Sequence, residues 1–206
     1  MDLQRLPIDH EGQGLRRFPV TTRVISWRFF TLLLVACTLT AAPATIAAQT
    51  SQEYALKAAF LYKFVEFVEW PADALPDSSS TINICVLGED PFGPNLESIR
   101  DKIVRGRKLT IRRMTQPERG ASCNVLFISS SERERVGEVV SSLGTSSVLT
   151  VGDMDSFAER GGIINLVNER NHVRFEINVH AAEHARLKIG SRLLNLARLI
   201  RSATSP

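Results

Sequence analysis

The chain has 206 residues, of which 44% are apolar, and its 25 basic and 22 acidic side chains leave a formal net charge of +3. Residues 1–48 contribute five arginines and three acids, so residues 49–206 carry 20 bases against 19 acids. This near-neutral remainder excludes a protein that binds nucleic acid through its overall charge, and it is long enough for one domain with its own core.

The first 48 residues have the three parts of an export signal. Arginines precede a short apolar run, residues 29–37, and small residues follow it up to Ala48. The run is shorter than the ~20 residues of a membrane-spanning helix. We therefore expect residues 1–48 to be a signal peptide and residues 49–206 to be the periplasmic domain. Leu34 to Cys37 also fits a lipobox, so lipidation at Cys37 is the alternative route of export.

Cleavage at Ala48 leaves two cysteines, Cys85 and Cys123, in an oxidising compartment. Two thiols that are exported together are a disulfide candidate, and closing a loop of this length would stabilise the fold by roughly 4 kcal/mol. The alternative is a pair of buried free thiols.

An apolar stripe at helical spacing predicts the first helix of the mature chain, which should stop at Trp70-Pro71. The stripe consists of Tyr54, Ala58, Leu61, Val65 and Val68, with Phe60, Phe64 and Phe67 beside it. We interpret the aromatic residues as core and not as a binding groove, because a helix this apolar is usually buried against a sheet.

Short apolar runs bounded by turn residues predict strands that alternate with helices. The expected strands before the last third of the chain are 82–87, 109–113, 124–128 and 147–151. A helix is expected between Pro91 and Arg100. A capping box formed by Ser131 and Glu134 predicts a second helix that ends near Gly144.

The last third of the chain has the pattern of a hairpin followed by a helix. Residues 163–167 and 173–177 flank a short polar turn, which favours an antiparallel pair of strands. An amphipathic helix is expected from His180 to Ser202. The whole pattern predicts an α/β fold, a single layered domain with a mixed β-sheet flanked by helices, ending in a C-terminal β-hairpin and amphipathic helix.

Several blocks of the chain resemble the YfiR family of bacterial periplasmic proteins, and they occur in the family's order. They are Lys57 to Pro71, Cys123 to Ile128, Val173 to Asn178 and Leu187 to Leu194. The resemblance implies a regulator that is not an enzyme and has no cofactor. YfiR binds the periplasmic domain of the inner-membrane diguanylate cyclase YfiN and holds it inactive, and an outer-membrane lipoprotein relieves this repression.

Repression of a diguanylate cyclase, and with it lower cyclic di-GMP and less biofilm, is therefore the first functional hypothesis. Other family members sit beside sensor kinases or outer-membrane receptors. A ligand-binding module that acts with a sensor kinase or transport system is the alternative, and homodimer formation stays open. The resemblance also implies that Cys85 pairs with Cys123. The second disulfide of YfiR has no counterpart here, which favours a structural role for the first.

Residues 180–184 spell the H-x-x-E-H motif of inverted zinc proteases. His180 and His184 would share a helical face, with Glu183 as the base that activates water. A third protein ligand is missing after His184, because no Asp, Glu, His or Cys follows it. We interpret the motif as a solvated helix start, and a zinc hydrolase is the third hypothesis. No nucleotide-binding glycine motif or nucleophile elbow is present.

The C-terminal region carries a local surplus of positive charge, with no acid after Glu183. The candidate partner-binding residues are Arg186, Lys188, Arg192 and Arg198. They would attract an acidic partner surface. The alternative is a solvated basic face that complements the dipole at the end of a helix.

Overall fold

The computed structural model of the protein describes residues 43–116, 122–170 and 172–200, with side chains from residue 49 onward. Residues 45–206 belong to one compact unit. The predicted export signal lies outside the described residues, Cys37 included, except that positions 43–48 begin a helix. None of the helices in the described part of the chain is long and apolar enough to cross a membrane.

Helix α2, Pro43–Phe67, contains the predicted apolar stripe as far as Val65 and ends just before Val68, which begins a short strand. Most of the stripe is buried, as is Phe64 beside it, and Tyr54, Phe60 and Phe67 are partly buried against the same core. Phe60 and Phe64 pack against Phe175 of the sheet, with ring centroids 5.6 and 5.4 Å apart respectively. The interpretation of this aromatic side of the helix as core is confirmed.

Two sheets are formed by the strands of the described residues. The smaller sheet pairs β1, Val68–Glu69, antiparallel with β9, Lys188–Ile189. The larger has eight strands in the order β10-β8-β7-β6-β5-β2-β4-β3. These strands are β2 Thr81–Leu87, β3 Ile103–Val104, β4 Arg107–Met114, β5 Val125–Ile128, β6 Leu149–Gly152, β7 Ile164–Glu169, β8 His172–Asn178 and β10 Arg198–Ile200.

The larger sheet is mixed, as expected. Its strands β4, β2, β5, β6 and β7 run parallel to one another. The predicted hairpin is present, because β8 runs antiparallel to β7, with Ile164 opposite Ile177. The final strand, β10, then runs parallel to β8 and forms one edge of the sheet.

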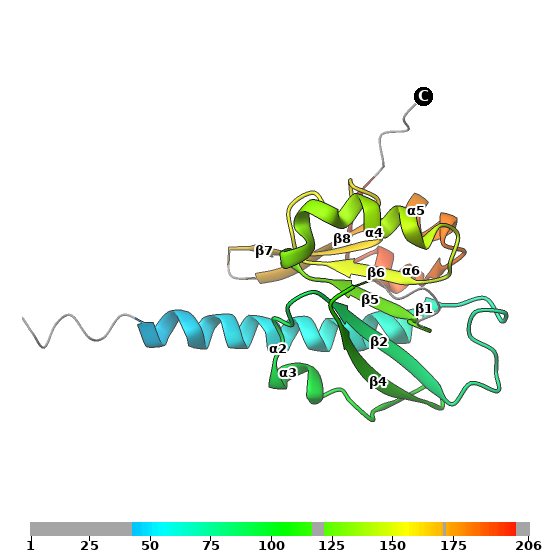
Figure 1. Ribbon diagram of the computed structural model, residues 1–206, viewed down its shortest axis with the longest axis horizontal. Coiled ribbons are helices and arrows are strands. Elements are labelled where there is room, and N and C mark those ends of the chain that lie inside the picture. The colour runs from blue at the N-terminus through cyan, green and yellow to red at the C-terminus, as the bar shows by residue number, and fades with distance from the viewer. Residues whose placement is uncertain (1–42, 117–121, 171, 201–206) are drawn as a thin grey trace, which may run out of the picture. The chain divides into compact units, whose positions relative to one another are not determined.

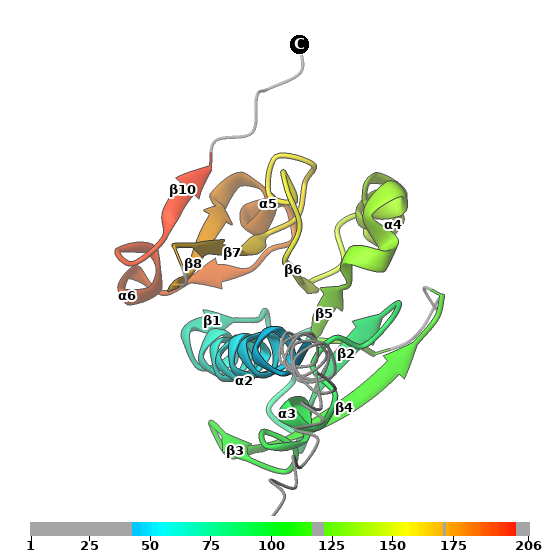
Figure 2. The same ribbon diagram turned by 90° about the vertical axis from the view of Figure 1, so that its left-hand side faces the viewer.

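Helices cover both faces of the larger sheet (Figures 1 and 2). Helix α2 lies on one face, and α4, Val136–Leu143, and α5, Val179–His184, lie on the other. Within β2, Ile84 and Val86 belong to the core that includes α2, whereas Cys85 and Leu87 pack with residues of α4. Burial on both faces explains why the central strands are nearly continuous apolar runs. The predicted α/β layered fold is confirmed.

Two predicted helices differ in detail. The helix expected from Pro91 to Arg100 is a single turn, α3, Pro94–Glu97. The prediction of a capping box at Ser131 is wrong. The hydroxyl oxygen of Ser131 instead accepts a hydrogen bond from the backbone N–H of Glu89, at 3.0 Å. Ser129 instead caps a 3₁₀ helix, η1, Ser130–Arg135, and α4 follows it and ends before Gly144 as predicted.

The prediction of a continuous helix from His180 to Ser202 is wrong. The chain instead forms α5, β9, a short helix α6, Ser191–Leu194, and β10. Arg186 breaks the helix with φ of 57°, a left-handed conformation. The backbone N–H of Gly190 donates to Phe67 O at 2.8 Å, and a side chain there would collide with that carbonyl. Pairing with β1 and β8 thus replaces the hydrogen bonds of a helix.

Candidate functional site

Cys85 and Cys123 form a disulfide between the neighbouring strands β2 and β5. Cys85 is fully buried in β2, and Cys123 lies two residues before β5. The bridge closes a sequence separation of 38 residues in the centre of the sheet. This is the pairing that the resemblance implied, and its position inside the core fits a structural role.

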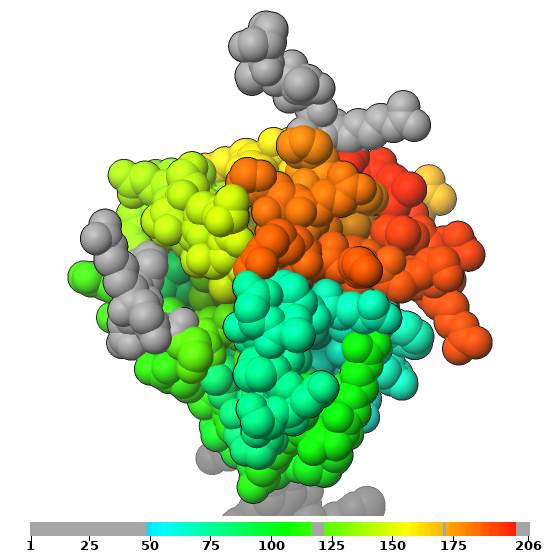
Figure 3. All heavy atoms as spheres, turned by 90° about the vertical axis from the view of Figure 1, so that its right-hand side faces the viewer, coloured from blue at the N-terminus to red at the C-terminus, as the bar shows by residue number. Residues whose placement is uncertain are grey.

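The four candidate partner-binding residues lie on different elements of the C-terminal segment, which we define as residues 186–200. In Figure 3 this segment, orange to red, lies directly beside the residues that follow α2, in turquoise. Arg186 Nη1 is 2.9 Å from Asp73 Oδ2, which joins the two regions. Lys188 of β9 and Arg192 of α6 are exposed, and neither has an ion-pair partner among the described residues.

Arg198 anchors the last strand and is not a free surface cation. It forms an ion pair with Glu176, a buried residue of β8, and its Nη1 also lies 3.3 Å from Glu169 Oε1. The hydrogen bond with Glu176 raises the pKa of Arg198 further above its usual range. The second carboxylate oxygen of Glu176 accepts from Asn165 Nδ2 at 3.0 Å. These contacts hold β10 against β8.

Two apolar side chains of the C-terminal segment are exposed, and helical spacing did not predict them. Leu196 is 74% exposed and Leu199 is 52% exposed. A continuous helix would have placed Leu196 on the buried side with Leu193. Because the segment turns after α6, Leu193 is buried in the core and Leu196 is not. No sequence signal for this exposure is visible without the tertiary path of the chain.

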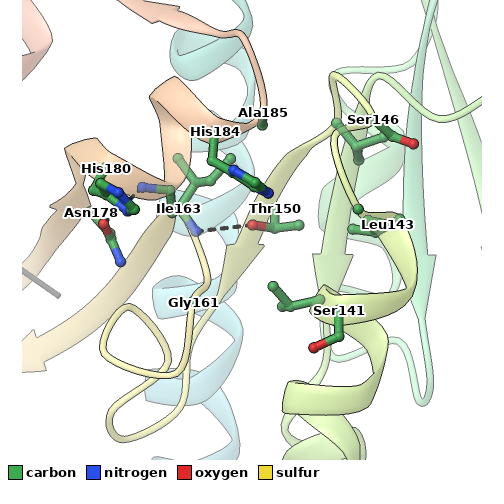
Figure 4. Close-up of a pocket in the computed structure, with 14 residues that line it drawn as sticks. Ser141, Leu143, Ser146, Thr150, Gly161, Ile163, Asn178, His180, His184 and Ala185 are labelled. Atoms are coloured by element: carbon green, nitrogen blue, oxygen red, sulfur yellow. Dashed lines mark hydrogen bonds between the residues drawn. The ribbon is translucent and has the colours of Figure 1, made fainter. Parts of the chain in front are cut away.

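A cavity of about 320 Å³ lies between α4 and α5. Figure 4 shows His180 and His184 of α5 across the gap from Ser141 and Leu143 of α4. The floor is tied together by Thr150 Oγ1, which accepts from the backbone N–H of Ile163 at 2.9 Å. Apolar walls with a few polar groups are typical of small-molecule sites.

Asn178 fixes α5 at the edge of this cavity. Its side-chain oxygen accepts from the backbone N–H of Ala181 at 2.9 Å and caps the helix. Its amide nitrogen donates to Ala158 O at 2.7 Å, in the loop before β7. The wall of the cavity is therefore held in place by buried hydrogen bonds.

The two histidines of the H-x-x-E-H motif both line the cavity, but Glu183 does not. Within the ranges that the structure describes, no three His, Cys, Asp or Glu side chains gather where they could hold a metal ion. The described residues thus do not supply the third ligand that zinc chemistry requires.

A buried ionic cluster joins α2 to the carboxyl end of β6, and no sequence pattern predicted it. Lys57 Nζ is 2.8 Å from Asp153 Oδ2 and 2.7 Å from Glu53 Oε1. Tyr54 Oη donates to the same Asp153 oxygen at 2.8 Å. Burial, together with the Asp153 carboxylate, raises the pKa of Tyr54. Lys57 belongs to the first block of the resemblance, and its role here is to fix the helix on the sheet.

Comparison with known proteins agrees with the resemblance. The profile of the YfiR/HmsC-like family matches residues 54–198, which extends from α2 to the start of β10. A search of curated proteins finds no match. The match covers most of the chain and contains the disulfide, the cavity and most of the C-terminal segment. The chain belongs to the YfiR/HmsC-like family.

Proposed function

We propose that the protein is a periplasmic regulatory binding protein that represses a membrane-bound diguanylate cyclase by binding its periplasmic sensory domain. This activity would lower cyclic di-GMP and biofilm formation. The observation that carries the proposal is the family match over residues 54–198, since that family suggests a periplasmic regulator of diguanylate cyclase signalling.

The C-terminal segment supports a binding role. Lys188 and Arg192 offer exposed positive charge, and Leu196 and Leu199 of the same segment offer exposed apolar surface. Interfaces combine apolar side chains with complementary charge, so this segment suits an acidic partner surface that has an apolar centre. We assign direct contact to Lys188 and Arg192. Arg186 and Arg198 contribute by holding the segment in position.

The first test is the cellular cyclic di-GMP level after deletion of the gene. Deletion should raise the level. Complementation by the full gene should restore it, and complementation by a version that lacks residues 1–48 should not, because that version stays in the cytoplasm. An unchanged level in cells that demonstrably make the protein would contradict cyclase repression. An outer-membrane lipoprotein that relieves repression is a further expected partner, and its overproduction should raise cyclic di-GMP in the wild type.

The cavity between α4 and α5 favours a second candidate function, a ligand-binding module that acts with a sensor kinase or transport system. Ser141→Leu would place a larger side chain at the cavity wall. Under this second function, the substitution should abolish the signalling output while the exposed residues of the C-terminal segment tolerate change. If substitution of Lys188 and Arg192 abolishes the signalling output while the Ser141→Leu variant stays active, the result would favour the repressor function over the ligand-binding function.

A further inference from the structure

The cavity between α4 and α5 has accessible apolar walls. Val140, Leu143 and Val148 are only partly buried, because each packs against the core on the α4 side of the sheet and also lines the cavity. Ile163 and Ala185 lie deeper and are buried. Apolar side chains that stay accessible in a concave site are the surface that the apolar body of a ligand covers.

The hydrogen-bonding groups of the cavity lie where a ligand can reach them. Ser141 of α4 and His180 and His184 of α5 line the cavity, and all three residues are exposed. Figure 4 shows the imidazole of His184 reaching from α5 toward α4. A serine hydroxyl both donates and accepts, and so does a neutral imidazole through its two nitrogens. These groups therefore suit a hydroxyl or an amide, which needs both kinds of partner.

The walls do not favour a charged ligand. Among the described residues that line the cavity, none is Asp, Glu, Lys or Arg, so a cation would lose water without meeting a carboxylate. Leu143 ends α4 and Gly144 caps it, and both line the cavity, so the partial negative charge of the last carbonyls opposes an anion. On the α5 side, Asn178 already accepts from the N–H of Ala181, which removes a donor that an anion could use.

We propose that this cavity binds a small uncharged molecule with an apolar body and one hydroxyl or amide group. The body packs on Leu143, Val148 and Ile163, and the polar group bonds at the rim with His180 and His184. A volume of about 320 Å³ is the share of roughly ten water molecules, which gives room for a single ring or a short chain. The proposal rests on the second candidate function, for which it names the class of ligand.

A series of ligands that differ only in charge tests the proposal. Protein isolated from the cell is titrated by calorimetry at pH 7 with 2-phenylethanol, phenylacetate and 2-phenylethylamine, and with hexan-1-ol as a second neutral probe. At least one alcohol should saturate, and both charged compounds should bind about tenfold more weakly or worse than 2-phenylethanol. Saturation by neither alcohol at millimolar concentration overturns the proposal. Equal or tighter binding of a charged compound also overturns it.

Two neighbouring serines of α4 locate the binding. Ser141→Leu fills part of the cavity and should weaken binding of the alcohol about tenfold or more. The matched control is Ser142→Leu, because Ser142 is exposed, does not line the cavity and bonds to Val139 O through its hydroxyl. Its effect should stay within about twofold, the range of surface substitutions. Equal weakening by the two variants would place the binding elsewhere and overturn the proposal.

The histidines test the polar end of the ligand. His180→Ala with His184→Ala should weaken binding of the alcohol about threefold to tenfold, because a neutral hydrogen bond is lost. His172→Ala is the control, since His172 is exposed on β8 and does not line this cavity. The proposal is overturned if the double variant binds as tightly as His172→Ala does.

Binding by the isolated protein and signalling output in cells are separate measurements, so the two failures can be told apart. Absence of binding overturns the proposed ligand class, whatever the output in cells. Binding that Ser141→Leu removes, together with normal output of that variant in cells, would establish the site and contradict the second candidate function.

Discussion

The centre of the larger sheet and the C-terminal segment are held in place by different forces. In the centre, β2, β5 and β6 are buried on both faces, and a disulfide joins the β2–β5 region. The C-terminal segment buries Leu187 and Leu193, and the rest of it is held by backbone hydrogen bonds, such as that of Gly190 to Phe67, and by ion pairs of Arg186 and Arg198. The centre is thus buried on both faces, whereas the C-terminal segment leaves Lys188, Arg192, Leu196 and Leu199 exposed.

This division has a physical reason. Burial of apolar side chains stabilises by roughly 25 cal/mol per Å², so the fully buried side chains of the central strands contribute strongly to the folding free energy. A segment with few buried apolar residues opens more readily, and mobile or recognition elements come from such regions. Its exposed leucines are consistent with a surface that a partner covers.

The largest expected effect is loss of the central disulfide. Replacing Cys85 and Cys123 together by alanine should lower the free energy of unfolding by about 4 kcal/mol, because the unfolded chain regains the entropy of a loop closed over 38 residues. Denaturant unfolding measures the change, and reduction of the wild-type protein should reproduce it. A loss below about 1 kcal/mol would mean that apolar packing alone holds the centre.

Release of the last strand, β10, should lower the free energy of unfolding by less than loss of the disulfide does. Arg198→Gln leaves the buried carboxylate of Glu176 without its cation, but 61% of the Arg198 side chain is exposed, which weakens the pair. We expect a loss of about 1–2 kcal/mol and faster amide exchange in β10, with β2 and β5 unchanged. Arg174→Gln on the neighbouring strand is the control, because Arg174 makes only a distant contact of 3.9 Å with Glu169. Wild-type exchange in β10 would contradict the anchoring role.

Charge reversal on the C-terminal segment should leave stability almost unchanged. Lys188→Glu with Arg192→Glu should alter the free energy of unfolding by less than about 0.5 kcal/mol, since both side chains are exposed. In cells the same double variant should raise cyclic di-GMP toward the level of the deletion strain. The matched control is the double variant Arg133→Glu with Arg135→Glu near α4, which should leave the cyclic di-GMP level low. Equal behaviour of the two double variants would show that this segment is not the interface.

The smallest expected effect is the acid sensitivity of the cluster on α2. Burial opposes ionisation of Glu53, yet hydrogen bonds from Lys57 and Asn168 hold its pKa below the ordinary value of 4.5. The folded state therefore favours the ionised form, so this stabilisation is complete above pH 4.5 and disappears as the pH falls through the lower, folded pKa. Unfolding measured from pH 6 downward should show a smaller loss of stability in Glu53→Gln than in the wild type. Identical pH profiles would contradict this assignment.

The central strands could be predicted from sequence because their signal is local. Residues such as Ile84 and Val86 are apolar in a short run that ends at a turn, and a strand buried on both faces needs that pattern. The hairpin of β7 and β8 was predictable for the same reason. The capping of η1 was not, because the hydroxyl of Ser131 bonds to Glu89, on a loop far away in the sequence.

The candidate sites depended more on tertiary structure. Both cysteines with their pairing, and all four basic residues, were predicted at the level of the sequence, but the partners of the basic residues were not. Glu176 is 22 residues from Arg198, and Asp153 is 96 residues from Lys57. The cavity between α4 and α5 lies between elements that are distant in the chain, so no local pattern marks its walls.

The amino-acid sequence by itself determined the alternation of strands and helices, the helix before Trp70-Pro71 and the family, since each depends on patterns of residues that are neighbours in the sequence. Only the tertiary structure decided the path of residues 186–200. Their apolar spacing permits a helix, but the carbonyl of Phe67, the edge of β8 and the buried carboxylate of Glu176 offer better partners. Those partners exist only after the sheet has formed, and they leave Lys188, Arg192, Leu196 and Leu199 exposed.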